Sequence, residues 1–600
     1  MSNSYIVLFI SRVLYYLRLI FEDSFVYRLT EKKQKPIKSN IVRTLMDNEL
    51  IEKSSSFKLV DKIFNPKHLF YANESILLKI ISKPFSTFIS GFTGGIVALI
   101  YASMLFYKNY IVFSIITLFI GSFFIYFLHK YLKKQVYKTS LIYSLFSYFL
   151  NLDRNFNDDI KFIDNLSFNF LYFLFSFILT LITSILLDFR LSIVILVGLS
   201  SIGIIYKYRL FAVLSFLTIY AFLPDIMILL FSFLIFGLSI IDYFSGHNKT
   251  IKTNAILYSA FLITILYIVQ TLTGLFPIYS LRELSMNLAG FFMMIFLISE
   301  INTKNKLHVL LNCLILGSCL ISLYGLYQYV FKGTVAREWI DASLKGVINK
   351  RAYSVFNNPN IFSEYLVLTT PLSVLMLWYH RDFFKKFVYC GIFLLNSLNL
   401  LLTFSRGGYL SLAVSACVFL FFVLRPLLVL MIPASLFGMS FLPATILNRI
   451  LSIFNFKDSS TSYRMKLWKI TREVIQDHPL AGVGLGHKSF KTIFETYIRS
   501  MPIFHAHNTY LEMLAETGVV GFLTFIYCII ITFVNILKSA IKSEDKFIFL
   551  TGAAIIASGA GILIQGIFEH VIYINKIIIL LWVFYAISAI LKNICKQIRA

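Results

Sequence analysis

The segment NAILYSAFLITILYIVQTLT, residues 254–273, is twenty residues long and contains no charged side chain. A helix of this length measures about 30 Å, which matches the thickness of the hydrocarbon core of a bilayer. Comparable apolar runs follow one another along most of the chain, separated by short polar connections. Because lipid offers no partner to a free backbone amide, these runs predict membrane-spanning helices.

The composition excludes a large soluble protein. Of the 600 residues, 58% are hydrophobic and only 14% are charged, so a soluble fold would have too little polar surface. The net charge of +25 could indicate nucleic-acid binding, but no nucleic-acid motif accompanies it, and basic loops beside membrane spans explain it better. The six cysteines show no paired spacing and therefore predict neither disulfides nor a zinc site.

We predict an all-α, polytopic transmembrane helical bundle of about 14–16 spans with both termini in the cytoplasm. The predicted spans lie near residues 86–107, 110–128, 167–187, 191–206, 210–222, 226–243, 254–273, 284–300, 308–330, 361–379, 387–404, 408–424, 427–443, 509–537, 548–569 and 575–591. Lys and Arg concentrate in alternate loops of this arrangement, as the positive-inside rule requires. The exact number of spans stays open.

Three regions are predicted along the chain. Residues 1–85 form a cytoplasmic or interfacial N-terminal region, residues 86–208 form accessory transmembrane helices, and residues 209–600 form the main transmembrane domain. The apolar stretch 4–21 contains two arginines and lacks a signal-peptide cleavage site, which favours an interfacial helix over a true span.

Two connections are long, at about 331–360 and 444–508, and both are predicted to be extracytoplasmic. Long loops in a compact bundle usually have a function. The second loop is predicted to contain short helices, and it contains nine Lys or Arg residues against four acidic ones. This excess predicts an anionic ligand on that face, with contact to anionic lipid headgroups as the alternative.

The sequence HAHNTYLEMLAETGVVG, residues 505–521, lies where the second loop meets a span. His507 is a candidate general base, because imidazole exchanges a proton near neutral pH. An interfacial hydrogen-bonding role is the alternative. His505 and His507 could also bind a metal, but no third ligand stands nearby in the sequence. Gly518 and Gly521 are expected on one helical face, where they would permit close packing.

Arginines supply the candidate anion contacts. Arg406, in TFSRGGYL, falls at the membrane edge, where a guanidinium either contacts an anion or extends to the interface. In SSTSYRMKLWKITREVIQDHPLAGVGLG, residues 459–486, we expect a helix that ends before Pro479. Arg464, Trp468 and Arg472 would share one face of it and could bind phosphate oxygens, although a headgroup-binding helix is also compatible.

The other long loop ends in RAYSVFNNPN, residues 351–360. Turn formation alone explains the asparagines before the next span. Contacts of Arg351 or Asn360 with a sugar are the less favoured alternative.

Taken in order, RAYSVFNNPN, SRGG, the Arg464-x-x-x-Trp468 loop with HPLAGVGLG, and H-N-x9-G-x-x-G resemble the signature region of the O-antigen ligase and polymerase superfamily. The resemblance covers residues 350–525 by motif and extends from about 210 to the C-terminus by general layout. Ser354 stands where that family usually has Gly. Residues 1–200 resemble no family that we can name.

The resemblance implies a glycosyltransferase that uses no metal or other cofactor and acts on the extracytoplasmic face of the cell membrane. The implied donor is an undecaprenyl-diphosphate-linked glycan, and the acceptor is a glycan, a lipid or a protein; nucleic acid is not a partner. Carried over, Arg406 and Arg464 would bind the donor diphosphate and His507 would act as the base. Arg472, Arg351, Asn508 and Trp468 would supply supporting contacts to the substrate.

Two other functions remain open. A transporter or flippase of lipid-linked glycans would also need many helices, but it should show repeated halves and a charged central passage, and the sequence shows neither. A non-catalytic membrane scaffold is the other alternative. The sequence does not decide between polymerase and ligase, and it leaves the sugars, the acceptor, the role of the first 200 residues and the oligomeric state open.

Overall fold

The structure is a computed structural model that describes residues 54–64, 84–105, 147–148, 170–186, 189–244, 251–332, 350–454, 459–499 and 503–599. Three predicted features lie outside these residues: the interfacial helix 4–21, the span 110–128, and most of the loop 331–360.

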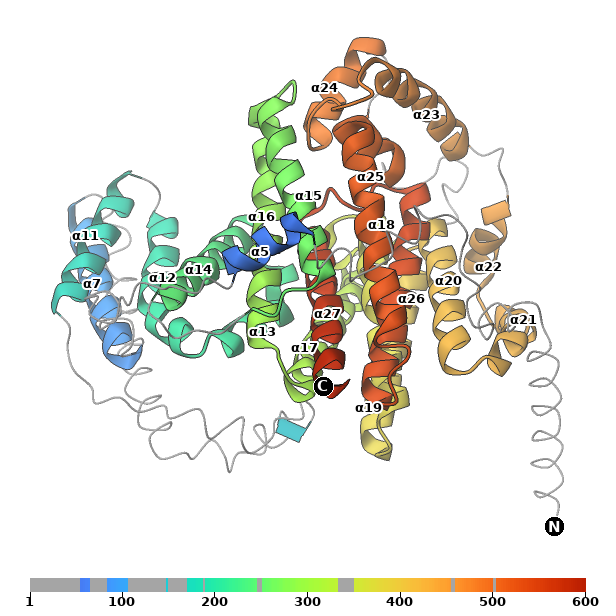
Figure 1. The fold of residues 1–600 in the computed structure, drawn as a ribbon, viewed down its shortest axis with the longest axis horizontal. Coiled ribbons are helices and arrows are strands. Elements are labelled where there is room, and N and C mark those ends of the chain that lie inside the picture. The colour runs from blue at the N-terminus through green and yellow to red at the C-terminus, as the bar shows by residue number, and fades with distance from the viewer. Residues whose placement is uncertain are drawn as a thin grey trace.

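Every regular element in this part of the chain is a helix, which confirms the all-α fold class (Figure 1). The elements are α5 (Ser55–Phe64), α7 (Pro84–Leu105), α11 (Phe170–Leu186), α12 (Phe189–Lys207), α13 (Arg209–Ile219), η3 (Tyr220–Phe222), α14 (Asp225–Phe244), α15 (Ala255–Thr273), α16 (Pro277–Glu300), α17 (Lys304–Phe331), η6 (Ser354–Phe356), α18 (Pro359–Tyr379), α19 (Phe383–Leu402), α20 (Arg406–Val423), α21 (Pro426–Met439), α22 (Ala444–Leu451), η7 (Ser452–Phe454), α23 (Ser459–Asp477), α24 (His487–Tyr497), α25 (Thr509–Lys538), α26 (Lys546–Phe568) and α27 (Asn575–Arg599).

Nine of the described helices are long and apolar enough to cross a membrane, or ten if one bent pair forms a single span. That pair comprises Ser200–Lys207 and Arg209–Phe222, which meet at an angle of 108° where the sequence predicted two separate spans. The predicted span 427–443 corresponds to α21, which has only 14 residues. The polytopic bundle is therefore confirmed, whereas the total of 14–16 spans stays a prediction.

Three of the loops predicted to be cytoplasmic, those before α15, α17 and α26, lie at one end of the bundle together with the end of α27. Lys304 pairs with Asp545, which connects the loop before α17 to the loop before α26. At the same end, the Asn593 amide donates to the backbone oxygen of Lys252 at 3.0 Å. These contacts agree with the predicted grouping, and the assignment of the loops to the cytoplasm stays a prediction.

The loops predicted to be extracytoplasmic meet at the other end. Arg351 Nε donates to the backbone oxygen of Thr403 at 2.7 Å, which connects the segments before α18 and α20. Leu275 donates its backbone N–H to Val483 at 3.3 Å, which connects the α15–α16 turn to the second long loop. This end of the bundle holds the candidate site.

Part of the second long loop forms a small lobe above the bundle, at the top of Figure 1, and it contains short helices as predicted. Helices α23 and α24 enclose a core of their own, which includes Leu467, Val474, Val483, Phe490 and Phe494. Helix α23 ends at Asp477, before Pro479, as expected. The lobe thus presents one face of α23 to the end of the bundle.

Helix α25 is broken at Gly518, whose φ of +63° and ψ of −173° are not helical. A Cβ atom at Gly518 would lie 2.2 Å from the backbone oxygen of Leu480, so the lobe contacts α25 closely there. The expectation of close packing was right, but the expectation that Gly518 and Gly521 share one continuous helical face was wrong. A positive φ interrupts the helix, and glycine adopts it without steric cost.

Candidate functional site

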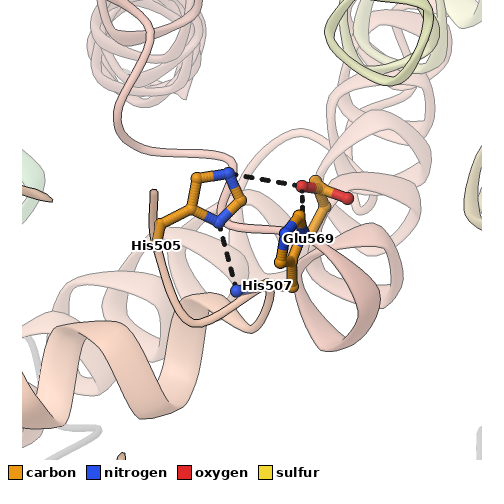
Figure 2. Close-up of side chains that lie close together, drawn as sticks. All are labelled: His505, His507 and Glu569. Carbon is orange, nitrogen blue, oxygen red and sulfur yellow. Dashed lines mark hydrogen bonds and ion pairs between the residues drawn. The ribbon is translucent and has the colours of Figure 1, made fainter. Parts of the chain in front are cut away.

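Glu569, directly after α26, is the centre of a polar cluster at the outer end of the bundle. Figure 2 shows His505 and His507 directed toward its carboxylate. His507 Nδ1 lies 2.7 Å from Oε1 of Glu569, and His505 Nε2 lies 3.4 Å from the same oxygen. The other oxygen, Oε2, lies 3.5 Å from Arg464 and accepts a hydrogen bond of 3.3 Å from Asn360. We call these five residues the Glu569 cluster.

The hydrogen bonds indicate which ring nitrogens carry protons. The backbone N–H of His507 donates to His505 Nδ1 at 3.1 Å, so in neutral His505 the proton is on Nε2, which faces Glu569. In the same way, the carboxylate favours a proton on Nδ1 of His507. The Nε2 atom of His507 is then left with a lone pair, as a general base requires.

Burial and charge act in opposite directions on this cluster. Glu569 is 5% exposed, and burial alone would raise the pKa of its carboxyl group. His507, His505 and Arg464 outweigh burial and hold that pKa far below its usual range, so Glu569 is ionised at neutral pH. Burial lowers the pKa of His505 well below 6.5 and keeps this ring neutral. His507 is 28% exposed and remains accessible.

The backbone around His507 is held by tight local structure. His507 has a φ of +49°, which non-glycine residues adopt rarely and which accumulates at functional sites. The next residue, Asn508, caps α25 by accepting from the N–H groups of Tyr510 and Leu511, and its amide donates to Ile567. These hydrogen bonds of Asn508 fix the start of α25 and therefore the position of His507.

Helix α23 brings Arg464 and Trp468 to the cluster on one face, as expected. The indole N–H of Trp468 donates to the backbone oxygen of Ala506 at 3.0 Å, between the two histidines. Arg464 is 21% exposed, so its guanidinium contacts Glu569 and still has accessible donors. Arg472, two turns further along α23, is exposed.

Arg351 is connected to the cluster through Asn360. Its side chain is 7% exposed and donates to Thr403 and, at 3.2 Å, to Oδ1 of Asn360. The Nδ2 atom of Asn360 in turn donates to Glu569. Ser354, where the resembled family usually has glycine, has a φ of +50°, a conformation that glycine adopts more easily.

Arg406 begins α20 at the same end of the bundle. Its guanidinium donates to the backbone oxygen of Ser452 at 3.2 Å. Next to it, a Cβ atom at Gly407 would lie 3.6 Å from Cβ of Phe568, the residue that precedes Glu569. The structure therefore places Arg406, Arg464 and His507 at one end of the bundle, and it connects Arg464 and His507 through a shared carboxylate.

A metal ion is the alternative occupant of this cluster. One ligand atom of each of His505, His507 and Glu569 lies within 4.8 Å of the others. The sequence showed no third ligand, and Glu569 supplies one from 62 residues away. However, the two imidazoles, the guanidinium and the Asn360 amide already offer donors to both carboxylate oxygens, which favours a hydrogen-bonded cluster.

Glu569 and the pairing role of Asn360 were missed at the sequence level. Glu569 follows an apolar helix by one residue, and no motif marks it. Its only signal is the pair of titratable residues Glu569 and His570 in a short connection between two spans. Charged residues at such a position are costly and therefore usually functional.

Comparison with known proteins gives two findings. Residues 391–526 match the family model described as O-Antigen ligase, which confirms the resemblance predicted from the sequence. The chain is also 34% identical over 128 residues to the exopolysaccharide production protein ExoQ of Rhizobium meliloti (strain 1021). That match covers 20% of this chain and 29% of the relative.

The matched family region contains Arg406, Arg464, Trp468, Arg472, His507 and Asn508. Arg351, Asn360 and Glu569 lie outside it. The Glu569 cluster therefore combines residues of the family region with residues from beyond both of its ends.

Proposed function

We propose that this protein is a membrane glycosyltransferase of the O-antigen ligase and polymerase type. It transfers a glycan from an undecaprenyl-diphosphate-linked donor to an acceptor hydroxyl on the extracytoplasmic face. The observation that carries the proposal is the contact of 2.7 Å between His507 Nδ1 and the buried carboxylate of Glu569, with Arg464 on the same carboxylate.

His507 acts as the general base. Glu569 accepts a hydrogen bond from Nδ1–H of His507, so the Nε2 atom of His507 can take the proton of the acceptor hydroxyl as that oxygen attacks the sugar carbon. The positive charge that develops on the ring is stabilised by the ionised Glu569, as in other carboxylate–imidazole pairs.

Arg464 and Arg406 hold the diphosphate leaving group. Guanidinium groups bind phosphate oxygens through paired hydrogen bonds and stabilise the negative charge that grows as the glycosidic bond breaks. Arg472 and Arg351 support the anionic part of the substrate, and Trp468 and Asn508 position the segment that contains His507. The transfer uses no metal, because protein donors supply the positive charge.

An apolar cavity next to the cluster suits the lipid of the donor. It has a volume of about 210 Å³ and lies among α15, α25, α26 and α27, with a lining that includes Phe525, Ile556 and Leu581. Thr509 also lines it and donates a hydrogen bond of 2.9 Å to the backbone oxygen of Glu569. A polyprenyl chain in this cavity would therefore end beside the proposed catalytic residues.

The test is transfer by the purified full-length protein in detergent or liposomes, with a lipid-diphosphate-linked glycan as donor. We expect His507→Ala to lower the rate by about 100-fold or more, the usual contribution of a positioned base. Lys491→Ala, which changes an exposed side chain on α24, is the control for membrane insertion.

Unchanged transfer by the His507→Ala variant would contradict the proposal. If the wild-type protein moved the donor across a bilayer without lengthening or transferring its glycan, the transporter alternative would be supported instead. The product separates the two activities within the family: a longer lipid-linked chain indicates a polymerase, whereas a glycan on a new carrier indicates a ligase.

A further inference from the structure

We propose that Glu512, Glu516 and His570 form a binding site for one divalent transition-metal cation, separate from the Glu569 cluster. One ligand atom from each of the three residues lies within 4.8 Å of the other two. We call these residues the Glu512 cluster. The proposal does not depend on the transfer activity.

The three side chains are almost completely buried. Glu512 is 0% exposed, Glu516 is 3% exposed and His570 is 2% exposed. Glu512 and Glu516 are one helical turn apart at the start of α25 and therefore project on the same side. His570 reaches them from the connection between α26 and α27.

Each carboxylate has one oxygen satisfied by the backbone and one without a protein donor. Oε2 of Glu516 accepts the N–H of Gly486 at 2.9 Å, and Oε2 of Glu512 accepts the N–H of Ala506. Apart from the contact between the two carboxyl groups, Oε1 of both glutamates and Nδ1 of His570 receive no hydrogen bond from the described residues. Buried polar atoms without partners are rare in folded proteins, and three of them in one cluster suit a positively charged ligand.

The donor set indicates the kind of cation. Two carboxylate oxygens and one imidazole nitrogen suit Zn²⁺ or Mn²⁺ better than a purely oxygen-binding ion such as Ca²⁺. A doubly charged cation would neutralise both carboxylates, so burial of the group would no longer leave an unbalanced charge. Glu516 and His570 also line a cavity of about 10 Å³, enough for a particle of about the size of a water molecule.

The cation would join two segments that are far apart in the sequence, the start of α25 and the connection after α26. Glu516 contacts the glycine-rich turn at Gly486, Glu512 contacts Ala506 between the two histidines of the Glu569 cluster, and His570 follows Glu569 directly. Its role is therefore structural: it fixes the backbone on both sides of the Glu569 cluster without taking part in glycan transfer.

The test is the metal content of the full-length protein, purified through a tag without histidine and dialysed against Zn²⁺ or Mn²⁺ and then against metal-free buffer. Mass spectrometry should find about one cation per chain. Chelation should lower the melting temperature of the wild type by about 5 °C, as expected when a tight ligand is removed. In Glu516→Gln, whose side chain can still accept the N–H of Gly486, the cation content should fall at least tenfold, and chelation should not change the melting temperature.

Two variants locate the cation. His507→Ala should keep it, because His507 belongs to the other cluster. Glu364→Gln, which alters a buried glutamate on α18, is the matched control and should also keep it.

Three results would overturn the proposal. Retention of neither Zn²⁺ nor Mn²⁺ by the wild type would show that the two carboxylates share a proton instead. Loss of the cation in His507→Ala with retention in Glu516→Gln would place it at the Glu569 cluster. An equal loss of the cation in Glu364→Gln and Glu516→Gln would show that the Glu512 cluster does not bind it specifically.

Discussion

The Glu569 and Glu512 clusters are neighbours with equally buried carboxylates, but they differ in their donors. Glu569 faces donors from two imidazoles, a guanidinium and an amide. Glu512 and Glu516 each receive one backbone N–H and keep one oxygen without a protein donor. A buried carboxylate is stable as an anion when its surroundings supply the compensating charge. The protein supplies that charge at Glu569 and leaves it to a ligand at the Glu512 cluster.

The largest expected effect comes from removing the charge of Glu569. Glu569→Gln keeps the shape of the side chain but cannot stabilise a protonated His507, so the transfer rate should fall by about 100-fold, close to the loss expected for His507→Ala. The rate should be measured from the initial appearance of product with saturating donor. A fall of less than tenfold would mean that Glu569 does not act through His507.

Arg464 tests whether the geometry of the guanidinium matters in addition to its charge. Arg464→Lys should lower the rate by about 10- to 100-fold, because an ammonium group cannot contact Glu569 and a diphosphate with the same planar set of donors. The reciprocal change Lys469→Arg, on an exposed position of the same helix, is the control. Equal rates for the two variants would argue against a direct role of Arg464.

Asn360 tests the connection between Arg351 and Glu569. Asn360→Ala removes the amide that donates to Glu569 and accepts from Arg351, so the rate should fall by about tenfold, as for the loss of one buried hydrogen-bond partner. If Asn360 acts through Glu569, the substitution should change kcat more than the KM for the acceptor. A change confined to KM would indicate direct contact with a substrate.

The smallest effect is expected at His505. Burial lowers the pKa of His505 well below 6.5, so its ring is already neutral at pH 6 and does not gain or lose a proton between pH 6 and 8. His505→Gln keeps an acceptor and a donor, so the rate should fall by less than about fivefold. The pH profile of transfer should keep its shape. A shift of the acidic limb in this variant would show that His505 titrates during the reaction.

The sequence predicted the parts of the site that lie in motifs. The apolar runs predicted membrane-spanning helices, and the distribution of Lys and Arg predicted which loops share an end of the bundle. The spacing of Arg464 and Trp468 predicted that both lie on one helical face, and the structure confirms the helix that contains them. These predictions succeeded because each depends on local periodicity or on charge counts along the chain. The break of α25 at Gly518 was not predicted, because a single glycine leaves helical periodicity unchanged.

The sequence alone determined that this is a helical membrane protein. It also determined which side chains are available for a site: an imidazole and several guanidinium groups, predicted at one end of the bundle. What only the tertiary structure decided is how these groups are paired. Glu569 lies 62 residues from His507 and 105 residues from Arg464, and no local pattern predicts that the three meet. The physical reason is that hydrogen bonds between distant segments depend on how the helices pack, whereas helix formation in lipid depends on the segment itself.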